Sequence, residues 1–483
     1  MEWKKLNQLN SEEIKKLQSE SLRKFVRYQL PFSPYYRKLF QEHHLSFDDI
    51  ENLDDLQRMP FSSKRDIAPT ADDQGRQRNF ILQPDESLIK EHASALTLAK
   101  IVKGKVFRQD VKRELEREYK PIHIHFTTGR TALPTAFSYS ERDITQLKET
   151  GARMLDVIGI PRSTFAVNAF PYAPHLAYWL TFYAMQEIGL SSVQTGGGKI
   201  MGTKKIMDLI ERVKAGLVTF IPGYCHFLLR KAVEERRDFS SLKYIVFGGE
   251  RVAPGLRDKV RDLLAKLGSK NPTIFTSYAF TEGKTAWLQC AENTGYHLYP
   301  DMEYFEVIDK EGNRVKDGEP GELVYTSLNW RGTVVMRYKT GDLVQGIEYN
   351  PCPHCGKTVP RIHPDIQRSS EIKEFHLTKI KGELINLNAF YPLLSGHPQI
   401  DEWIVEIRKK DDDPFGIDEL VVHIAPHAGV NFEKLIPEVK ELILNEAGVG
   451  ARITETPVAE LLQKMGMETE LKEKRIIDNR PTV

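Results

Sequence analysis

A threonine- and glycine-rich loop is the first segment of the chain whose residue types suit a chemical task. Residues 127–135 read Thr-Thr-Gly-Arg-Thr-Ala-Leu-Pro-Thr and follow a short apolar run. Hydroxyl groups and accessible backbone N–H groups suit a phosphate, because small residues let the backbone approach an anion. The spacing is not that of a GxxxxGK[ST] loop, and the sequence holds no GxGxxG fingerprint. By itself, an ordinary threonine-rich turn explains this loop as well.

Three further turns place a carboxylate beside glycine. They read Gly-Gly-Glu at 248–250, Ser-Tyr-Ala-Phe-Thr-Glu-Gly at 277–283 and Tyr-Lys-Thr-Gly-Asp at 338–342. The first closes the apolar run 244–247, and the carboxyl end of a parallel strand commonly borders a ligand crevice. A carboxylate at such a turn could hold Mg²⁺ or a ribose hydroxyl. Taken singly, each segment is equally a plain turn.

The cysteines form a second constellation. Cys352 and Cys355 make a CxxC turn followed by glycine, and Cys290 lies seven residues before His297. Structural Zn²⁺ takes four N or S ligands in a tetrahedron, and three cysteines with one histidine are a common set. The spacing therefore predicts a zinc site formed by Cys290, His297, Cys352 and Cys355. Four protein ligands leave no open position, which favours a structural rather than a catalytic metal.

Other interpretations of these cysteines stay open. His354 is a rival fourth ligand, and the CxxC turn could instead be a redox pair or carry unliganded thiols. Cys225 is expected to be a buried core thiol.

The apolar pattern predicts an α/β protein. We expect helices in the first 60 residues, a mixture of helix and strand over 87–120, and a solvated helix face at 110–120. From residue 121 strands and helices alternate, which predicts a parallel sheet with crossover helices. Residues after 300 are typical of hairpins, and the last 110 or so return to a mixture of strand and helix.

Length and composition exclude several classes of protein. The chain has 483 residues, 40% of them hydrophobic and 28% charged, which is typical of a folded protein of more than one domain. The net charge, 68 − 67 = +1, argues against a general nucleic-acid binder. The most apolar run, 176–185, is shorter than the about 20 residues that a membrane span needs. The N-terminus lacks an apolar signal core, so we expect a cytoplasmic protein without a membrane partner.

The order of the polar turns carries more information than any one of them. A Thr/Gly loop, then Gly-Gly-Glu, Tyr-x-x-Thr-Glu and Tyr-x-Thr-Gly-Asp resembles the adenylate-forming superfamily of acyl- and aryl-CoA synthetases. Within it the chain is most similar to the phenylacetate–CoA ligase family. The stretch LPFSPYYRKLFQEHHLSFDDIENLDDLQRMPFSSKRDI resembles that family's opening, and LKEKRIIDNR resembles its C-terminal lysine motif. The resemblance covers the chain except for residues 74–120, which are enlarged.

The resemblance implies a fold and a division into domains. A large N-terminal AMP-binding (adenylation) domain with stacked α/β layers and a β-rich subdomain would span residues 1–368. A small mobile α+β domain would follow over 369–483, with a hinge near residues 368–371. Such a hinge absorbs a change of backbone dihedrals at a few positions.

The resemblance also implies roles for individual residues. Those that would bind ATP or AMP are Thr127, Thr128, Gly129, Arg130, Thr131, Gly248, Gly249, Glu250, Tyr278, Asp342 and Arg368. The phosphates would lie against the 127–131 loop, the adenine against 248–250 and Tyr278, and the ribose on Asp342. Thr281 would touch the AMP phosphate and Glu282 would hold Mg²⁺. Lys472 would bridge the carboxylate and the α-phosphate, where charge accumulates during the reaction.

The acyl pocket of the relatives corresponds to an aromatic turn and a glycine turn. Its candidates here are Tyr172, His175, Gly197 and Ala279. Aromatic side chains suit a flat ring. Packing alone explains Tyr172 and His175 equally well.

The expected function is ATP-dependent, AMP-forming activation of an aryl carboxylic acid, followed by thioester formation with coenzyme A. ATP, Mg²⁺, coenzyme A and a structural Zn²⁺ would take part, and a homodimer is open. Two departures from the family keep rivals open. Ala132-Leu133 stand where relatives carry Gly-Lys, and the hinge reads Ser-Ser-Glu in place of paired aspartates. The rivals are an adenylate-forming enzyme with an amine or phenol acceptor, and a catalytically weak nucleotide-binding protein.

Overall fold

The computed structural model divides into two compact units that interleave along the chain. It describes residues 3–70, 72–106, 110–127, 134–250, 252, 255–368, 377–380, 383–410, 418–467 and 473–480. Unit 1 comprises Met1–Ser163, Ala173–Ser191 and Ser277–Gln367. Unit 2 comprises Thr164–Tyr172, Ser192–Thr276 and Arg368–Val483. The functional division at residue 368 stays a prediction.

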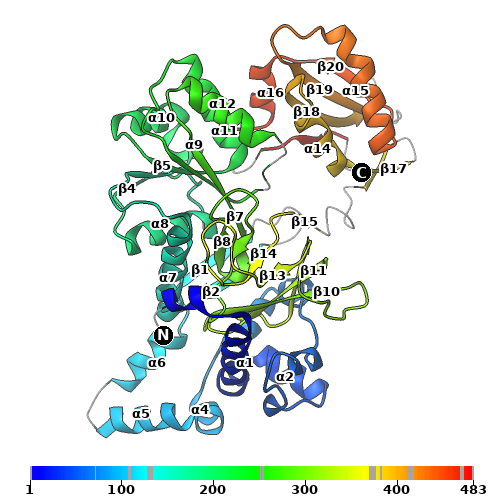
Figure 1. The fold of residues 1–483 in the computed structure, drawn as a ribbon. Helices are drawn as coiled ribbons and strands as arrows, with labels where there is room; N and C mark the ends of the chain where they lie inside the picture. The colour runs from blue at the N-terminus through cyan, green and yellow to red at the C-terminus, as the bar shows by residue number, and fades with distance from the viewer. Residues whose placement is uncertain are drawn as a thin grey trace. The chain divides into compact units, whose positions relative to one another are not determined.

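Unit 1 begins with helices and ends with strands (Figure 1). Its helices are η1 (Trp3–Gln8), α1 (Ser11–Tyr28), η2 (Leu30–Phe32), α2 (Pro34–Glu42), η3 (Phe47–Asp49), η4 (Asp55–Arg58), α3 (Lys64–Ile67), η5 (Arg76–Phe80), α4 (Glu86–His92), α5 (Ala95–Val106), α6 (Val111–Tyr119), α7 (Glu141–Ile158), α8 (Leu176–Glu187) and η6 (Thr281–Gly283). Its strands are β1 (His123–Phe126), β2 (Ala136–Tyr139), β8 (Thr285–Leu288), β9 (Tyr296–His297), β10 (Glu303–Ile308), β11 (Gly321–Ser327), β12 (Tyr338–Val344), β13 (Ile347–Glu348), β14 (Arg361–Ile362) and β15 (Ile366–Arg368).

Unit 2 holds the parallel strands and the C-terminal elements. Its strands are β3 (Ala166–Asn168), β4 (Ser192–Gln194), β5 (Leu217–Phe220), β6 (Tyr244–Phe247), β16 (Leu377–Ile380), β17 (Glu383–Asn386), β18 (Ile400–Lys409), β19 (Asp418–Pro426), β20 (Arg452–Glu455) and β21 (Ile476–Asp478). Its helices are α9 (Gly198–Met201), α10 (Thr203–Arg212), α11 (Pro222–Glu234), α12 (Leu256–Lys266), η7 (Leu387–Ala389), α14 (Phe390–Ser395), α15 (Phe432–Ala447) and α16 (Val458–Lys464). β7 (Thr273–Phe280) is shared, since the two units meet in sequence between Thr276 and Ser277.

The parallel sheet confirms the alternation of strands and helices expected from residue 121. The strand order is β4-β3-β5-β6-β7, and each neighbouring pair is parallel. β5 is buried along its whole length, as its continuous apolar run predicts for a strand covered on both faces. The core around these strands also takes residues of α10, α11 and α12 (green in Figure 1). Cys225 lies in that core, fully buried, as expected.

A second sheet of unit 2 lies in the C-terminal part of the chain. Its strand order is β20-β19-β18-β21, with β18 and β19 antiparallel and the outer pairs parallel. α14 and α15 close a separate core over it. A smaller cluster joins Phe227 of α11 to Ile404 and Leu461. An ion pair of 2.8 Å between Arg230 and Asp401 lies between the same elements.

Most strands of unit 1 form small separate sheets. β10, β11, β12 and β15 follow one another in one sheet, β13, β14 and β9 make another, and β1 pairs with β2. Helix α7 precedes them and begins at a reciprocal cap, in which Ser140 and Asp143 each accept a backbone N–H of the other. It ends where Gly159 takes a left-handed conformation at φ 64°.

The expected mixture of helix and strand over 87–120 was wrong for the described residues. Residues 87–106 and 110–120 hold α5, α6 and most of α4, without a strand. Asp85 and Asp110 each accept a backbone N–H of the helix that follows, and this N-capping stabilises helix over strand. α6 has no buried residue, which confirms the solvated helix predicted at 110–120.

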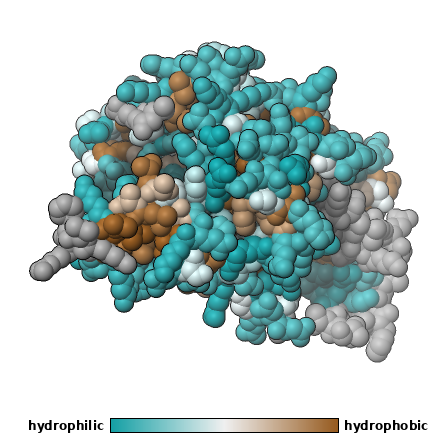
Figure 2. Space-filling model, turned by 90° about the horizontal axis from the view of Figure 1, so that it is seen from below, coloured by the Kyte–Doolittle hydropathy of each residue, from teal (hydrophilic) through white to brown (hydrophobic). Residues whose placement is uncertain are grey.

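Hydrophobic residues are few on the described surface. On the face drawn in Figure 2, hydrophilic residues predominate and hydrophobic ones gather in small areas. Leu96 and Val102 of α5 are 77% and 61% exposed. Within the described part of the chain, none of the helices combines the length and the apolar character that crossing a membrane requires.

A buried acid in β10 makes the stability of unit 1 depend on pH. Burial raises the pKa of Glu303 from 4.5 to about 8, although the Trp287 indole (2.5 Å) and the Tyr299 N–H (2.9 Å) donate to its Oε1. The folded chain thus holds this proton to a higher pH than the unfolded chain. Its contribution is fully present below pH 4.5 and lost as the pH rises through about 8.

We expect the free energy of unfolding to fall by roughly 2–4 kcal/mol between pH 5 and pH 9 in the wild type, and by much less in Glu303→Gln. Guanidinium denaturation across this range measures the difference. Glu311→Gln, an exposed position in the turn after β10, is the matched control. Equal slopes for the Glu303→Gln variant and the wild type would contradict the prediction.

Candidate functional site

Two carboxylates of the predicted nucleotide turns are held by tyrosine hydroxyls in unit 1. The Tyr278 hydroxyl donates to Oδ2 of Asp342 at 2.6 Å, and the Tyr338 hydroxyl donates to Oε1 of Glu282 at 2.9 Å. Each bond joins the segment 277–283 to the segment 338–342. The structure therefore brings together two turns that lie about 60 residues apart in the sequence.

The first of these turns connects β7 to β8, where the chain reverses its direction. The second half of β7 pairs with β8 in antiparallel register, with Ala279 opposite Ala286. The connection is the single 3₁₀ turn η6, which contains Thr281 and Glu282 and ends at Lys284 with φ 58°. A left-handed lysine is uncommon, because its Cβ approaches the backbone.

Tyr278 has aromatic neighbours on β8 and β9. Its ring lies 5.6 Å from the ring of Trp287 at 30°, and 5.9 Å from that of Tyr296. This packing fixes the ring plane and directs the hydroxyl to Asp342. Aromatic packing of this kind is consistent with a residue that presents a fixed ring to a flat ligand.

The second turn lies within β12. The pairing of β12 with β11 shifts register between Glu322 and Val324, and Gly341 has φ 75°, so the regular alternation of side chains is interrupted in this turn. Asp342 is buried, and its N–H donates to the Thr340 hydroxyl at 3.1 Å. Tyr338 was not among the predicted site residues. The signal was available, because Tyr338 opens the same Tyr-x-Thr-Gly-Asp motif that supplied Asp342.

The structure describes only the two ends of the predicted phosphate loop. Thr127 donates its N–H to the carbonyl of Thr135 at 3.0 Å, and its hydroxyl accepts the Thr135 N–H at 3.0 Å. These bonds close the hairpin of β1 and β2 at the start of the loop. Thr128, Gly129, Arg130 and Thr131, and the departures Ala132 and Leu133, lie outside the described residues.

A histidine chain supports β1 just before this loop. The buried His125 bonds to the Tyr139 hydroxyl through Nδ1 and to His123 through Nε2, both at 2.9 Å. Burial lowers the pKa of His125 to about 3, and the neighbouring His123 acts in the same direction. His125 is therefore neutral at physiological pH. Sequence reasoning missed it, because a histidine in a strand usually packs rather than signals a site.

The acyl-pocket candidates fall in both units. In unit 1, Nδ1 of His175 bonds to the Phe126 carbonyl at 2.8 Å, next to Thr127. In unit 2, the Tyr172 N–H donates to Gly196 at 3.0 Å, so the aromatic and glycine turns adjoin as expected. Gly197 has φ 80°, and a Cβ there would lie 3.0 Å from Cα of Pro171. Only glycine allows this approach without strain.

The Gly-Gly-Glu turn also lies in unit 2. Gly248 follows β6 and donates its N–H to the Phe220 carbonyl of β5 at 3.1 Å, and Gly249 has φ 82°. Gly248, Gly249 and Glu250 thus stand at the carboxyl end of a parallel strand, where the sequence placed them. Arg368 is the last residue of β15, and Lys472 lies outside the described residues.

The cysteine and histidine side chains predicted to bind zinc converge in unit 1. The ligand atoms of Cys290, His297, Cys352 and Cys355 all lie within 4.8 Å of one another. The two sulfurs of Cys290 and Cys352 are 3.5 Å apart, and Cys355 Sγ is 3.3 Å from Nε2 of His297. His354 is exposed and does not belong to this cluster.

The cluster fits a tetrahedral metal ion in donor type and spacing. Zn–S bonds of about 2.3 Å set sulfur atoms about 3.8 Å apart at the corners of a tetrahedron. His297 bonds through Nδ1 to the Leu288 carbonyl at 3.3 Å, which leaves Nε2 for a metal. The Gly356 N–H closes the CxxC turn on the Cys352 carbonyl at 2.9 Å.

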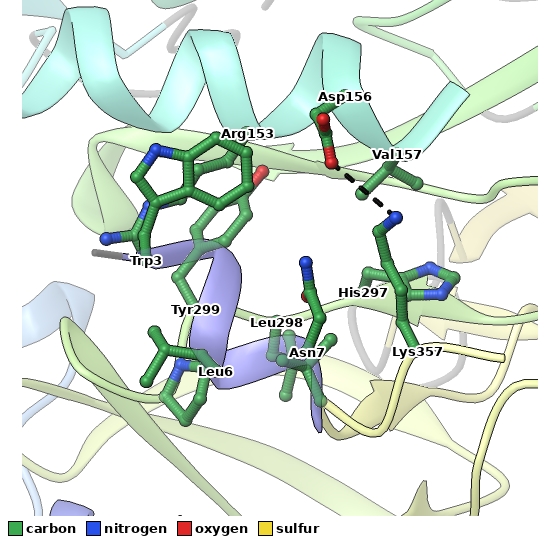
Figure 3. Close-up of a pocket in the computed structure, with 12 residues that line it drawn as sticks. Trp3, Leu6, Asn7, Arg153, Asp156, Val157, His297, Leu298, Tyr299 and Lys357 are labelled. Carbon is green, nitrogen blue, oxygen red and sulfur yellow. Dashed lines mark ion pairs between the residues drawn. The ribbon is translucent and has the colours of Figure 1, made fainter. Parts of the chain in front are cut away.

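A small pocket lies beside this cluster, under the N-terminal turn η1 (Figure 3). Trp3 and Tyr299 lie on either side of the Arg153 guanidinium, with ring centroids 5.6 and 5.7 Å from it. Lys357 pairs with Asp156 at 3.5 Å across the pocket. None of the described residues of the predicted nucleotide turns lines this pocket. His297 of the cysteine and histidine cluster is one of its lining residues.

Sequence comparison places this architecture in a family. The sequence model of the AMP-binding enzyme family matches residues 59–337, more than half of the chain. The chain therefore belongs to this family, as the order of its polar turns predicted. The expected mixed α/β fold is confirmed as well.

Particular relatives agree with this assignment. A phenylacetate-coenzyme A ligase of Thermus thermophilus is 26% identical over 375 residues, which cover 76% of this chain and 73% of the relative. That of Aromatoleum evansii is 24% identical over 495 residues, covering 99% and 97%. A solved structure of a 2-hydroxyisobutyryl-CoA ligase in the postadenylation state aligns with a TM-score of 0.73 and 21% identity, covering 99% of this chain and 92% of the other. At this identity the structural match shows a shared fold.

The hydrogen bond between Tyr278 and Asp342 is open to a double-mutant cycle. We expect Tyr278→Phe to cost about 1–2 kcal/mol of unfolding free energy, because the acceptor is a buried carboxylate. With Asp342→Asn the two changes should couple by about 1 kcal/mol in chemical denaturation. Tyr119→Phe, which removes a hydroxyl bonded to Gln29 at 2.8 Å, should add to Asp342→Asn without coupling. Additivity of the Tyr278 and Asp342 changes would show that these turns do not meet.

Proposed function

We propose that the protein is an acid–thiol ligase that activates a carboxylic acid with ATP, forms an acyl-adenylate and transfers the acyl group to coenzyme A. The observation that carries this proposal is the joining of the Tyr278–Glu282 and Tyr338–Asp342 segments in a member of the AMP-binding enzyme family. The similarity to phenylacetate-coenzyme A ligases over most of the chain supports it.

The first step makes a mixed anhydride. A carboxylate oxygen of the acid attacks the α-phosphorus of ATP, the bond to the β-phosphate breaks, and pyrophosphate leaves with the electron pair. Negative charge grows on the α-phosphoryl oxygens, so fixed cations and donors lower the barrier. In the second step the coenzyme A thiolate attacks the acyl carbon, and AMP leaves.

Within unit 1, each described side chain has a role that suits its contacts. Asp342 accepts the ribose hydroxyls, and the bond from Tyr278 fixes the carboxylate for this. Glu282 holds Mg²⁺, since a carboxylate is the oxygen ligand that this ion prefers. Thr281 precedes it in η6 and donates its hydroxyl to the AMP phosphate. Tyr278 presents its ring to the adenine.

The remaining assignments follow from the family. The threonine-rich loop from Thr127 to Thr131 binds the phosphates, and the turn 248–250 lines the adenine. Lys472, carried by a mobile domain over residues 369–483, bridges the reacting carboxylate and the α-phosphate. Its hinge lies at Arg368 and the residues after it.

An aryl acid is the substrate class that fits the acyl-pocket candidates. Tyr172 and Gly197 adjoin through the turns of unit 2, and Tyr172 is 54% exposed, so its ring is accessible to a ligand. His175 and Ala279 stay pocket candidates through the family resemblance alone. Aromatic residues with a glycine floor accommodate a flat ring.

Pyrophosphate exchange tests the proposal directly. We expect the chain with Mg·ATP and a panel of aryl acids to exchange labelled pyrophosphate into ATP, and to release AMP at a higher rate when coenzyme A is added. Lys472→Ala should slow exchange about 10²–10³-fold, because it removes the cation at the developing charge. Lys464→Ala, a partly exposed lysine that pairs with Glu460 at 2.9 Å, is the matched control.

The outcomes separate the rivals. Exchange without a coenzyme A effect would favour an amine or phenol acceptor. ATP binding by calorimetry without exchange for any acid would leave only a nucleotide-binding protein. Normal exchange by Lys472→Ala would remove the role of this lysine.

We also propose that Cys290, His297, Cys352 and Cys355 hold a structural zinc ion. The ion would fix the turn at 352–355 to the β8–β9 connection, in a region of short strands. It would supply stability and no step of the reaction.

Metal analysis of the purified chain should give about one zinc per chain, and a chelator should lower the melting temperature. Cys352→Ala should lose the metal, because three ligands hold zinc far less tightly than four. Cys225→Ala, whose thiol lies in the core of unit 2, should retain it. A metal-free chain with unchanged melting temperature would refute the zinc site.

A further inference from the structure

Lys284 is a fully buried lysine two residues after Glu282. Its side chain has 0% exposure, as has that of its partner Asp143. Burial of a charge is costly unless it is paired and hydrogen-bonded, so such a lysine needs a reason. The family resemblance gave it none, and its place directly after η6 ties it to the nucleotide turn.

The ammonium group of Lys284 reaches the hairpin of β1 and β2. Nζ donates to the Ser138 carbonyl of β2 at 2.7 Å and to Oδ2 of Asp143 at 3.1 Å. It also lies 4.6 Å from the ring centroid of Tyr139 and 5.4 Å from that of Trp330. A desolvated cation on aromatic faces gains a further attraction. These contacts with described residues therefore fix the position of the Lys284 ammonium group.

The contact extends from β2 to β1. Tyr139, under the ammonium group, bonds through its hydroxyl to Nδ1 of His125 in β1 at 2.9 Å. β1 and β2 then pair through Phe126 and Ala136, and the bonds between Thr127 and Thr135 close the hairpin where the threonine-rich loop begins. Lys284 thus contacts β2 directly and β1 through Tyr139 and His125.

The other end of the lysine belongs to the turn that carries Thr281 and Glu282. The Lys284 N–H donates to the Thr281 carbonyl at 3.2 Å, which closes η6. The Tyr338 hydroxyl holds Glu282 two residues earlier. The main chain of Lys284 therefore fixes the turn, and its side chain fixes the hairpin.

We propose that Lys284 is a positioning residue for the nucleotide, which sets the hairpin β1–β2 and the ends of the threonine-rich loop in register with the Thr281–Glu282 turn. The inference rests on the proposed function, because both segments are assigned there to the phosphates of ATP and to its metal. Lys284 itself touches no substrate, since its ammonium group is enclosed by protein.

The Asp143 carboxylate is prepared for this contact without the lysine. Its oxygens also accept the N–H groups of Arg331 at 2.8 Å and of Gly332 at 2.7 Å. A cation at Lys284 completes a shell that otherwise consists of neutral donors. Burial lowers the pKa of Lys284, and the Asp143 carboxylate offsets part of that effect.

Lys284→Met tests the proposal in the full chain. We expect the KM for Mg·ATP in pyrophosphate exchange to rise about tenfold, while kcat and the KM for the acid change less than about threefold. Hydrogen exchange should show faster exchange of the backbone amides over 123–139 and unchanged rates in β10 and β11. Lys284→Gln, which keeps a donor for Ser138, should recover part of both effects and serves if the methionine variant does not fold.

Arg153→Met is the matched control. It also removes a buried cation of unit 1, one that pairs with Asp301 at 2.6 Å, and it should reduce stability with the KM for Mg·ATP within about twofold. Equal rises of KM in both variants, or unchanged KM and amide exchange in Lys284→Met, would overturn the role of Lys284. Absence of pyrophosphate exchange in the wild type would instead contradict the proposed function.

Discussion

A buried carboxylate needs hydrogen-bond donors for both of its oxygens. In unit 1 the carboxylate of Asp143 has such a set of donors. Asp143 lies in the first turn of α7, accepts the N–H of Ser140 in the helix cap, and accepts bonds from the Arg331 and Gly332 backbone and from Lys284. These partners come from segments nearly 190 residues apart. A Cβ at Gly332 would lie 2.0 Å from the Ser138 carbonyl oxygen. The close approach of these two backbone segments therefore requires glycine at this position.

The neighbouring carboxylates of unit 1 differ in the partners that surround them. Asp143 accepts from a lysine and from backbone donors. The Glu303 carboxylate accepts from the Trp287 indole and the Tyr299 N–H, and burial raises its pKa to about 8. Asp342 and Glu282 each accept from a tyrosine hydroxyl. A tyrosine hydroxyl orients such a carboxylate by donating one hydrogen bond to it.

Much of this molecule could be predicted from local sequence. The alternation of apolar strands and helices gave the parallel sheet, and the CxxC spacing identified side chains that converge within 4.8 Å. Residues 87–120 were misjudged, because the helix caps at Asp85 and Asp110 outweigh an ambiguous apolar pattern. Lys284 and His125 could not have been found, since their importance comes from partners such as Ser138 and Tyr139 that no sequence spacing relates to them.

Trp287 gives this arrangement a built-in optical consequence. Its indole is fully buried, stacks at 5.6 Å on the ring of Tyr278, and donates to Glu303. Indole emission responds to nearby charge and to the planar groups around it. The fluorescence of Trp287 therefore responds to ionisation of Glu303 at the edge of the indole and to the surroundings of Tyr278 on its face. The unlabelled protein carries its own fluorescent reporter at this position.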